Sequence, residues 1–327
     1  MSIGTTPRKI SNSSLDWIKL GPRVFKLMWN RELAKTSSKS LDLGSALHCY
    51  LLEPDRFQDE YVIADFKTVG GLMGTFIKSV HLAKLELLPT EDDLPEELYQ
   101  AIADKVGFKI SLKAVMDGYK DPKYDAYKDA LKATHGVLTV SRQDMDIINA
   151  CHTAISSHKL ASQLILGNGI DTSDDIQIES EMVLEADMTG KYSVLPSIGL
   201  LDRVIIDHGK RKIILVDLKT TSNSVYLFQD SYLKYEYDRQ MAFYNDLLAS
   251  VYPEYSVDTY IVAVQTTYTT HTTDCAVFKI DADQIENGRV KYKRMLDRVS
   301  WHMSNDVWDY PQEYYESIGL CQINRNP

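Results

Sequence analysis

Long apolar runs are absent from this 327-residue sequence. None reaches the roughly 18 residues that a membrane-spanning helix needs. The N-terminal stretch MSIGTTPRKISNSS is polar and lacks the apolar core of a secretory signal peptide. We therefore expect a cytoplasmic protein without membrane contact.

Cysteine is scarce and scattered. The four cysteines share no short spacing and stand at Cys49, Cys151, Cys275 and Cys321. Zinc sites and iron–sulfur clusters need closely grouped thiolates, and disulfide frameworks need paired ones. The pattern therefore predicts buried, reduced thiols and no iron–sulfur cluster.

An excess of positive charge is also missing, since the net charge is −10. A passive, nonspecific coat for nucleic acid is therefore disfavoured, because phosphate binding needs positive charge. A metal site is compatible with this negative charge, since such a site requires clustered carboxylates. Residues 1–40 are locally basic, with eight Lys or Arg against two acids. This segment is either a DNA-contacting arm or a solvated helical face.

The periodicity of apolar residues predicts an α/β (α+β layered) fold. Helices are expected in the basic segment 1–40 and over 45–53, 142–157, 232–250 and 283–305. Strands are expected over 176–187, 197–207, 212–221, 258–267 and 275–280. Residues 65–135 are predicted to be a mostly helical insertion. We expect one domain over 1–327.

The most informative motif is Asp217-Leu218-Lys219 on the apolar strand 212–221. Side chains alternate along a strand, so Asp217 and Lys219 share one face and Leu218 points to the other. A turn at 208–210 would bring Asp202, on the preceding strand, alongside Asp217. Two neighbouring carboxylates repel each other unless a cation joins them. Their hard oxygen atoms suit Mg²⁺ or Mn²⁺.

An Asp-x-Lys tripeptide alone is weak evidence, because this sequence contains three. Asp65-Phe66-Lys67 lacks an upstream hairpin strand with a carboxylate, and Asp121-Pro122-Lys123 contains proline and no strand pattern. Only Asp217-Leu218-Lys219 has a carboxylate-bearing partner strand before it and a helix after it. That helix carries Gln240 and Tyr244, four residues apart and so on one face.

These motifs follow one another in an order that resembles the RecE-type (exonuclease VIII) exonucleases of the PD-(D/E)XK superfamily. The resemblance covers about 11–60 and 140–250. It rests on Ser11, Ser13, Leu15 and Pro22; on LGSALHCYLLEP with Gly44, His48, Glu53 and Pro54; on Glu179; on GLLDRV with Asp202; on VDLKTT with Asp217 and Lys219; and on Gln240 with Tyr244.

The resemblance implies a restriction-endonuclease-like core, a central mixed β-sheet flanked by helices, and a role for each motif residue. Asp202, Asp217 and the Leu218 carbonyl would ligate metal. His48 would join as a ligand or near neighbour, and Glu179 through a water. Lys219 would position the attacking water or stabilise charge, with Gln240 and Tyr244 orienting it or the scissile phosphate. DNA phosphates would meet basic residues, for which we select Arg23, Lys26, Arg31, Arg203 and Arg239.

The activity implied is hydrolysis of double-stranded DNA from its ends, 5′ to 3′, leaving 3′ overhangs for recombination. The cofactor would be Mg²⁺, replaceable by Mn²⁺, as two ions. A single-strand annealing protein and a homo-oligomeric ring are further implied partners. Two alternatives stay open: a nuclease of this fold acting on single-stranded, flap or branched DNA, and a noncatalytic module that binds DNA or a protein.

Overall fold

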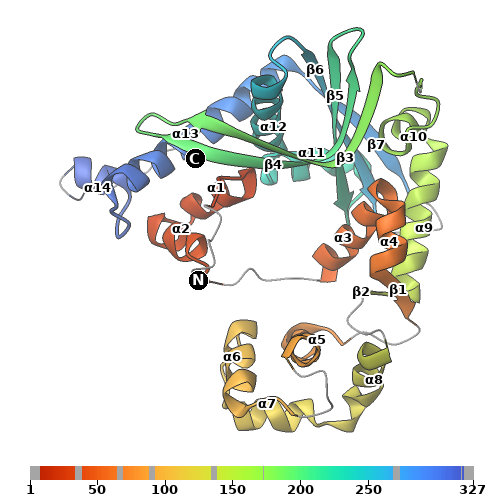
Figure 1. The fold of residues 1–327 in the computed structure, drawn as a ribbon, viewed down its shortest axis with the longest axis vertical. Helices are drawn as coiled ribbons and strands as arrows, with labels where there is room; N and C mark the ends of the chain where they lie inside the picture. Colours follow the sequence, from red (N-terminus) through yellow and green to blue (C-terminus); the bar gives the residue numbers. More distant parts are fainter. Residues whose placement is uncertain are drawn as a thin grey trace. The chain divides into compact units, whose positions relative to one another are not determined.

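The computed structural model describes residues 8–33, 39–64, 69–87, 93–133, 138–171, 173–267, 273–317 and 319 (Figure 1). The chain divides into two compact units. One consists of residues 1–35 together with 153–327, and the other of residues 36–152. The motif residues from Glu179 to Tyr244 all belong to the first unit, and His48 belongs to the second.

A five-stranded mixed sheet organises the first unit. Its strands lie in the order β3 (Ile176–Thr189), β4 (Val194–Asp207), β5 (Lys212–Thr221), β6 (Ser256–Gln265) and β7 (Cys275–Ile280). Neighbouring strands are antiparallel except β5 and β6, which are parallel. The parallel pair requires a crossover, which the helices between β5 and β6 supply. The sheet with its flanking helices confirms the expected α/β fold.

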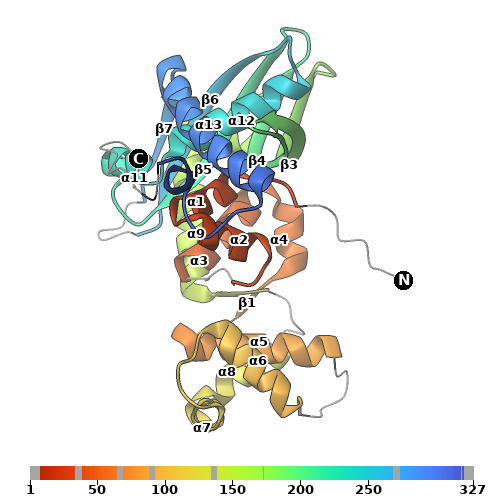
Figure 2. The same cartoon turned by 90° about the vertical axis from the view of Figure 1, so that its left-hand side faces the viewer.

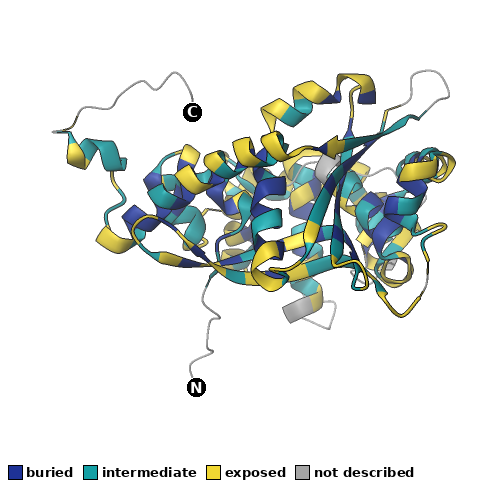
Figure 3. Ribbon diagram, turned by 90° about the horizontal axis from the view of Figure 1, so that it is seen from above, coloured by how far each residue is buried: buried dark blue, intermediate teal, exposed yellow. Residues whose placement is uncertain are grey.

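The helices α12 (Tyr237–Val251) and α13 (Ala282–Asn305) cover one face of this sheet (Figure 2). The apolar side chains of β3, β4 and β5 that face α12 form one continuous core with it and with α13. α10 (Lys159–Leu166) packs against β5 and β7 from the other face. Buried positions follow the sheet and the helix sides turned toward it (Figure 3). The helices of the unit are α1 (Asn12–Lys19), α2 (Pro22–Trp29), α10 (Lys159–Leu166), η2 (Val225–Leu227), α11 (Phe228–Lys234), α12 (Tyr237–Val251), α13 (Ala282–Asn305) and α14 (Gln312–Glu316).

The N-terminal helices are tied to the sheet by the residue before them. The Ile10 amide donates to the Pro196 carbonyl at 2.8 Å, and the Ile198 amide donates to the Ile10 carbonyl at 2.7 Å. Ser11 then caps α1 in a reciprocal pair with Ser14, which satisfies two otherwise unpaired groups at the helix end. Pro22 begins α2, where its missing N–H costs no helical hydrogen bond.

The expected helix 232–250 is divided in the structure. α11 ends at Lys234, and α12 begins at Tyr237. Between them Glu236 takes a left-handed backbone conformation with φ of 51°. Its carboxylate bonds to Lys19 and to Arg239 Nε, the latter at 2.9 Å. These two cations stabilise a Glu236 conformation that interrupts the helix. The residues around Glu236 do not predict this interruption.

The unit of residues 36–152 is mainly helical. Its cores are small: Phe76, Val80 and Val115 belong to one, and Ile77 and Leu131 to another. The described part of 65–135 is helical, as expected. The elements are α3 (Lys39–Leu52), α4 (Pro54–Glu60), β1 (Tyr61–Ala64), α5 (Gly71–Leu87), α6 (Glu96–Val106), α7 (Leu112–Tyr119), η1 (Pro122–Tyr124), α8 (Asp125–Ala133), β2 (Leu138–Ser141) and α9 (Arg142–Ser157), which runs on into the first unit. β1 and β2 pair in parallel.

Candidate metal and nuclease site

The candidate site lies where β4 and β5 part. Their antiparallel ladder runs from Asp207–Lys212 to Arg203–Val216 and ends there. Beyond that point β4 continues only against β3, and β5 only against β6. Asp202 and Asp217 are the next residue on each strand. The divergence leaves backbone groups of β5 without a β4 ladder partner and places two carboxylates beside them.

One of these backbone groups is already bonded to Asp202. The Leu218 amide donates to Asp202 Oδ2 at 2.7 Å. The N–H and C=O of one strand residue point to the same side of the strand, so the Leu218 carbonyl also faces the β4 side. Its side chain is fully buried on the face opposite Asp217 and Lys219. Burial raises the pKa of Asp202 above its ordinary value, because the charged form is poorly solvated there.

Asp217 and Lys219 form a close ion pair on the face covered by α12. Lys219 Nζ lies 2.6 Å from Asp217 Oδ2, with the aspartate side chain 1% exposed and the lysine 17%. Burial alone would lower the pKa of Lys219, but the negative charges of Asp217 and Asp202 outweigh it and raise that pKa above its usual value. The two carboxylates therefore favour the protonated form of Lys219.

α12 supplies the polar groups that hold this pair. Gln240 Nε2 donates to Asp217 Oδ1 at 3.1 Å and to the Tyr244 hydroxyl at 3.2 Å. Tyr244 is 9% exposed and belongs to the main core. Because a packed tyrosine fixes the amide and the amide fixes the carboxylate, Asp217 has one defined orientation. Gln240 and Tyr244 thus lie on one face of α12, as expected, and this face contacts the Asp-x-Lys motif.

β3 brings Glu181 to the site, an acid that no sequence motif singled out. Glu181 lies between the ladder pairs Ser180–Arg203 and Met182–Leu201, the same interval of the β3–β4 register in which β4 carries Asp202. Carboxylate oxygens of these two residues lie within 4.8 Å of one another. Glu179 instead lies opposite Val204, and its Oε1 accepts from Gln177 at 2.9 Å. Glu181 has φ of 49°, which breaks the regular alternation and lets two glutamates two residues apart point differently.

Two of the arginines selected for DNA contact, Arg203 and Arg239, make hydrogen bonds inside the protein. Arg239 is 1% exposed and donates to Asn12 O at 2.9 Å, to Asp16 at 2.6 Å and to Glu236. Arg203 donates to Ser180 Oγ at 2.6 Å and to the Ile165 carbonyl. Their guanidinium groups join elements of the fold, and their contact with DNA phosphates stays a prediction.

The other three basic residues lie at the surface. Arg23 and Lys26 on α2 pair with Asp309 at 3.0 Å and with Asp306 at 3.3 Å. The Arg23–Asp309 pair is about two thirds exposed, so water screens it and phosphate can replace the carboxylate. Arg31 is exposed beyond the end of α2. These residues remain a predicted contact surface for DNA.

His48 lies on α3, half-buried, in the unit of residues 36–152. It is on the same helix as Gly44, which the family pattern places four residues earlier. Its role as a metal ligand stays a prediction.

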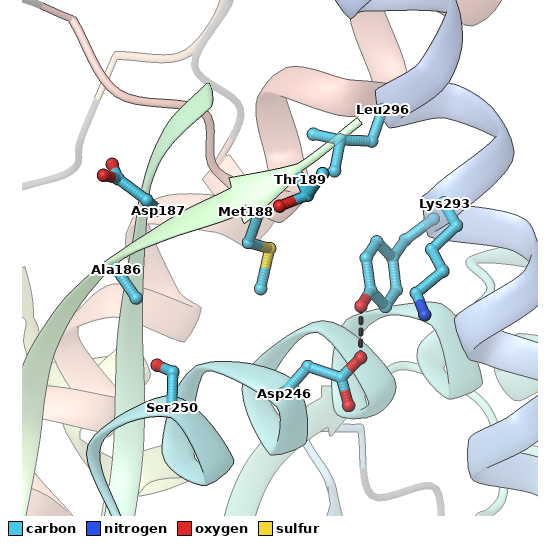
Figure 4. Close-up of a pocket in the computed structure, with 9 residues that line it drawn as sticks. Ala186, Asp187, Met188, Thr189, Asp246, Ser250, Lys293 and Leu296 are labelled. Carbon is cyan, nitrogen blue, oxygen red and sulfur yellow. Dashed lines mark hydrogen bonds between the residues drawn. The ribbon is translucent and has the colours of Figure 1, made fainter. Parts of the chain in front are cut away.

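A cavity of about 230 Å³ lies elsewhere in the first unit, between β3, α12 and α13 (Figure 4). Asp246, at its α12 wall, accepts from the Tyr292 hydroxyl and pairs with Arg289 at 2.8 Å. The carboxylate is thus engaged by its own neighbours. This network joins α12 to α13 and belongs to the scaffold, apart from the carboxylates at β4 and β5.

The mixed sheet, the Asp-x-Lys motif at the end of β5 and the acids beside it define a PD-(D/E)XK nuclease-like domain. The chain belongs to the family described as "PDDEXK-like domain of unknown function (DUF3799)", whose model matches residues 22–323. This membership confirms the expected superfamily, while the RecE type stays a prediction. Among the helices in the described part of the chain, none has the length and apolar character to cross a membrane.

Solved structures give more distant likenesses. A candidate exonuclease from Eubacterium rectale is 12% identical, with a TM-score of 0.36, over 76% of this chain and 89% of that one. A protein named SSO0001 is 13% identical, with a TM-score of 0.27, over 80% and 88%. No curated protein matches the chain.

Proposed function

We propose that this protein is a divalent-metal-dependent deoxyribonuclease that degrades double-stranded DNA from its ends, 5′ to 3′, and leaves 3′ overhangs. The observation that carries the nuclease assignment is the contact of Lys219 with Asp217 at the point where β4 and β5 part. A buried lysine and aspartate at the end of an apolar strand are costly to fold. A catalytic role would explain why this costly pair lies beside Asp202 and Glu181. The end preference and the polarity rest on the resemblance to RecE-type enzymes.

The donor set fits a hard divalent cation. Asp202, Asp217 and Glu181 offer carboxylate oxygens, and the Leu218 carbonyl faces the same side as Asp202. Mg²⁺ and Mn²⁺ prefer such oxygens. Two of these carboxylates lie within 4.8 Å of each other, and a cation between them would remove their repulsion. We propose His48 as a further ligand on the strength of the family pattern. When bound, the cation polarises a phosphoryl oxygen and acidifies water.

Side chains of the protein would supply the remaining functions, which are charge stabilisation and orientation of the site. Lys219 is a protonated donor, and in contact with a nonbridging phosphate oxygen it would stabilise the negative charge that develops during hydrolysis. Asp217 keeps the ammonium group in place through their 2.6 Å contact. Gln240 keeps Asp217 in place, and Tyr244 keeps Gln240 in place. The site is therefore oriented before substrate arrives, which lowers the cost of reaching the transition state.

The test is digestion of a blunt linear duplex labelled at one 5′ end, with Mg²⁺, with EDTA and with the Asp217→Asn protein. Short labelled products that appear early, and only with metal and the unaltered protein, are expected. A closed circular duplex of the same sequence should stay intact. Cleavage of single strands or flaps without cleavage of the blunt duplex would favour the alternative substrate class. Folded protein that cuts none of these DNAs with Mg²⁺ or Mn²⁺ would overturn the proposal.

A further inference from the structure

A row of aromatic rings leads from the catalytic lysine to the protein surface. Lys219 Nζ lies over the ring of Tyr237, 5.1 Å from its centre. The Tyr237 ring contacts the Tyr235 ring at 5.8 Å between centres. Lys234 Nζ then lies over the Tyr235 ring at 5.1 Å. The row thus begins at the cation of the candidate site and ends at a second cation, at the end of α11.

Exposure increases along this row. The Lys219 side chain is 17% exposed, Tyr237 is half-buried, and Tyr235 is 54% exposed. Tyr237 is supported from behind by Phe228, whose ring stacks at 5.7 Å and belongs to the main core. The inner ring is therefore rigid, while the outer ring offers an open face. Leu233, 59% exposed, adds apolar surface one residue before Lys234.

The charges beside the row favour a polyanion. Glu236, the acid between the two tyrosines, is bonded to Lys19 and Arg239, so cations already compensate its charge. Lys234 is exposed and has no ion-pair partner among the residues described in the structure. Exposed aromatic rings next to a free ammonium group are the features on which single-stranded nucleic acids bind, with bases on the rings and phosphates at the cation.

We infer that Tyr235 and Lys234, backed by Tyr237, hold unpaired nucleotides of the strand that enters the site. A base would stack on Tyr235 while its phosphate meets Lys234. Duplex DNA shields the faces of its bases, so this subsite would take the terminal nucleotides of a duplex strand once they have separated from the complement. The inference deepens the proposed nuclease function and rests on it: the substrate next to the scissile phosphate would be single-stranded.

Binding to a single strand tests this inference without cleavage. The probe is a short unpaired oligonucleotide with 2-aminopurine, and EDTA is present throughout. We expect stacking on Tyr235 to quench the probe in the unaltered protein. Tyr235→Ala should weaken binding about 10-fold, the size of one lost base–ring stack, and abolish the quench. Tyr235→Trp should preserve both. Tyr226→Ala is the matched control, because Tyr226 is 81% exposed in the same segment but has no ring contact among the described residues.

A second set of variants addresses the phosphate and the base separately. Lys234→Gln should make the plot of log affinity against log salt concentration less steep, by the amount that corresponds to about one lost phosphate contact. An abasic site in place of the quenched base should weaken binding to the unaltered protein and leave Tyr235→Ala with no further loss. Equal binding by Tyr235→Ala and the unaltered protein would overturn the inference, as would equal losses in Tyr235→Ala and Tyr226→Ala.

Failure of this inference and failure of the nuclease proposal can be told apart. If the unaltered protein cuts DNA but Tyr235→Ala neither weakens single-strand binding nor removes the quench, only the nucleotide subsite is wrong. If Tyr235 is needed for binding but no DNA is cut with Mg²⁺ or Mn²⁺, only the nuclease proposal fails.

Discussion

Glu181 on β3 and Asp202 on β4 lie in the same gap of the β3–β4 ladder, and the two carboxylates offer oxygens within 4.8 Å of one another. Like charges placed directly across an antiparallel pair destabilise a sheet. Here the unfavourable pair stands where β4 leaves β5, next to the ion pair of Lys219 with Asp217. Without a cation, the two neighbouring carboxylates destabilise the fold. With a cation between them, they can serve as its ligands.

Glu181→Gln should weaken Mn²⁺ binding, whereas Glu179→Gln should not. Removing one carboxylate from the ligand group should cost about 10-fold or more in affinity, measured by isothermal titration calorimetry. Without metal, Glu181→Gln should stabilise the protein slightly, by about 0.5 kcal/mol, because a repulsive cross-strand pair is relieved. Equal affinity losses in the two variants would contradict the placement of Glu181 at the site.

Lys219→Met should separate cleavage from metal binding. The variant removes a cation that competes for the same carboxylates, so Mn²⁺ should bind at least as tightly as in the unaltered protein. Cleavage should fall about 100-fold or more, because a donor to the developing charge is lost. Single-turnover rates at saturating Mn²⁺ measure the chemical step, and calorimetry measures binding. A variant that fails to bind Mn²⁺ but remains folded would refute the role given to Lys219.

Asp217→Asn should destabilise the metal-free protein, since it leaves the buried Lys219 ammonium group without its closest counter-ion. Loss of one partner of a buried pair costs about 3 kcal/mol. Urea unfolding of Asp217→Asn, Lys219→Met and the double variant forms a double-mutant cycle. The double variant should be more stable than Asp217→Asn alone. Additive effects would show that the two side chains do not interact in solution.

Loss of Arg239 should affect stability, whereas loss of Arg23 should affect DNA binding. Arg239→Met breaks a buried network that joins α1 to α12, and it should lower the free energy of unfolding by about 3 kcal/mol. Arg23→Ala removes an exposed pair and should change that free energy by less than about 1 kcal/mol. Only Arg23→Ala should reduce the salt dependence of DNA binding, by about one contact. Chemical denaturation and fluorescence anisotropy measure the two effects.

Features that depend on local spacing could be predicted from the residues alone. Alternation along an apolar strand places Asp217 and Lys219 on one face and Leu218 on the other, and the structure has them so. Helical spacing places Gln240 and Tyr244 together, and they are bonded through Gln240 Nε2. The bounds of β5 and β7 also follow from local pattern. Such features need no knowledge of distant residues, because the backbone geometry of a strand or helix fixes them.

The proximity of Glu181 to Asp202 and the burial of Arg239, in contrast, depend on the folded chain. Glu179 and Glu181 are two residues apart, so a regular strand would place them on one face; the positive φ at Glu181 separates them. Arg239 is buried because Asn12 and Asp16, more than 200 residues earlier in the chain, accept its hydrogen bonds. The parting of β4 from β5 depends on the strands beside each of them. These features arise from contacts between segments far apart in sequence, which local periodicity cannot encode.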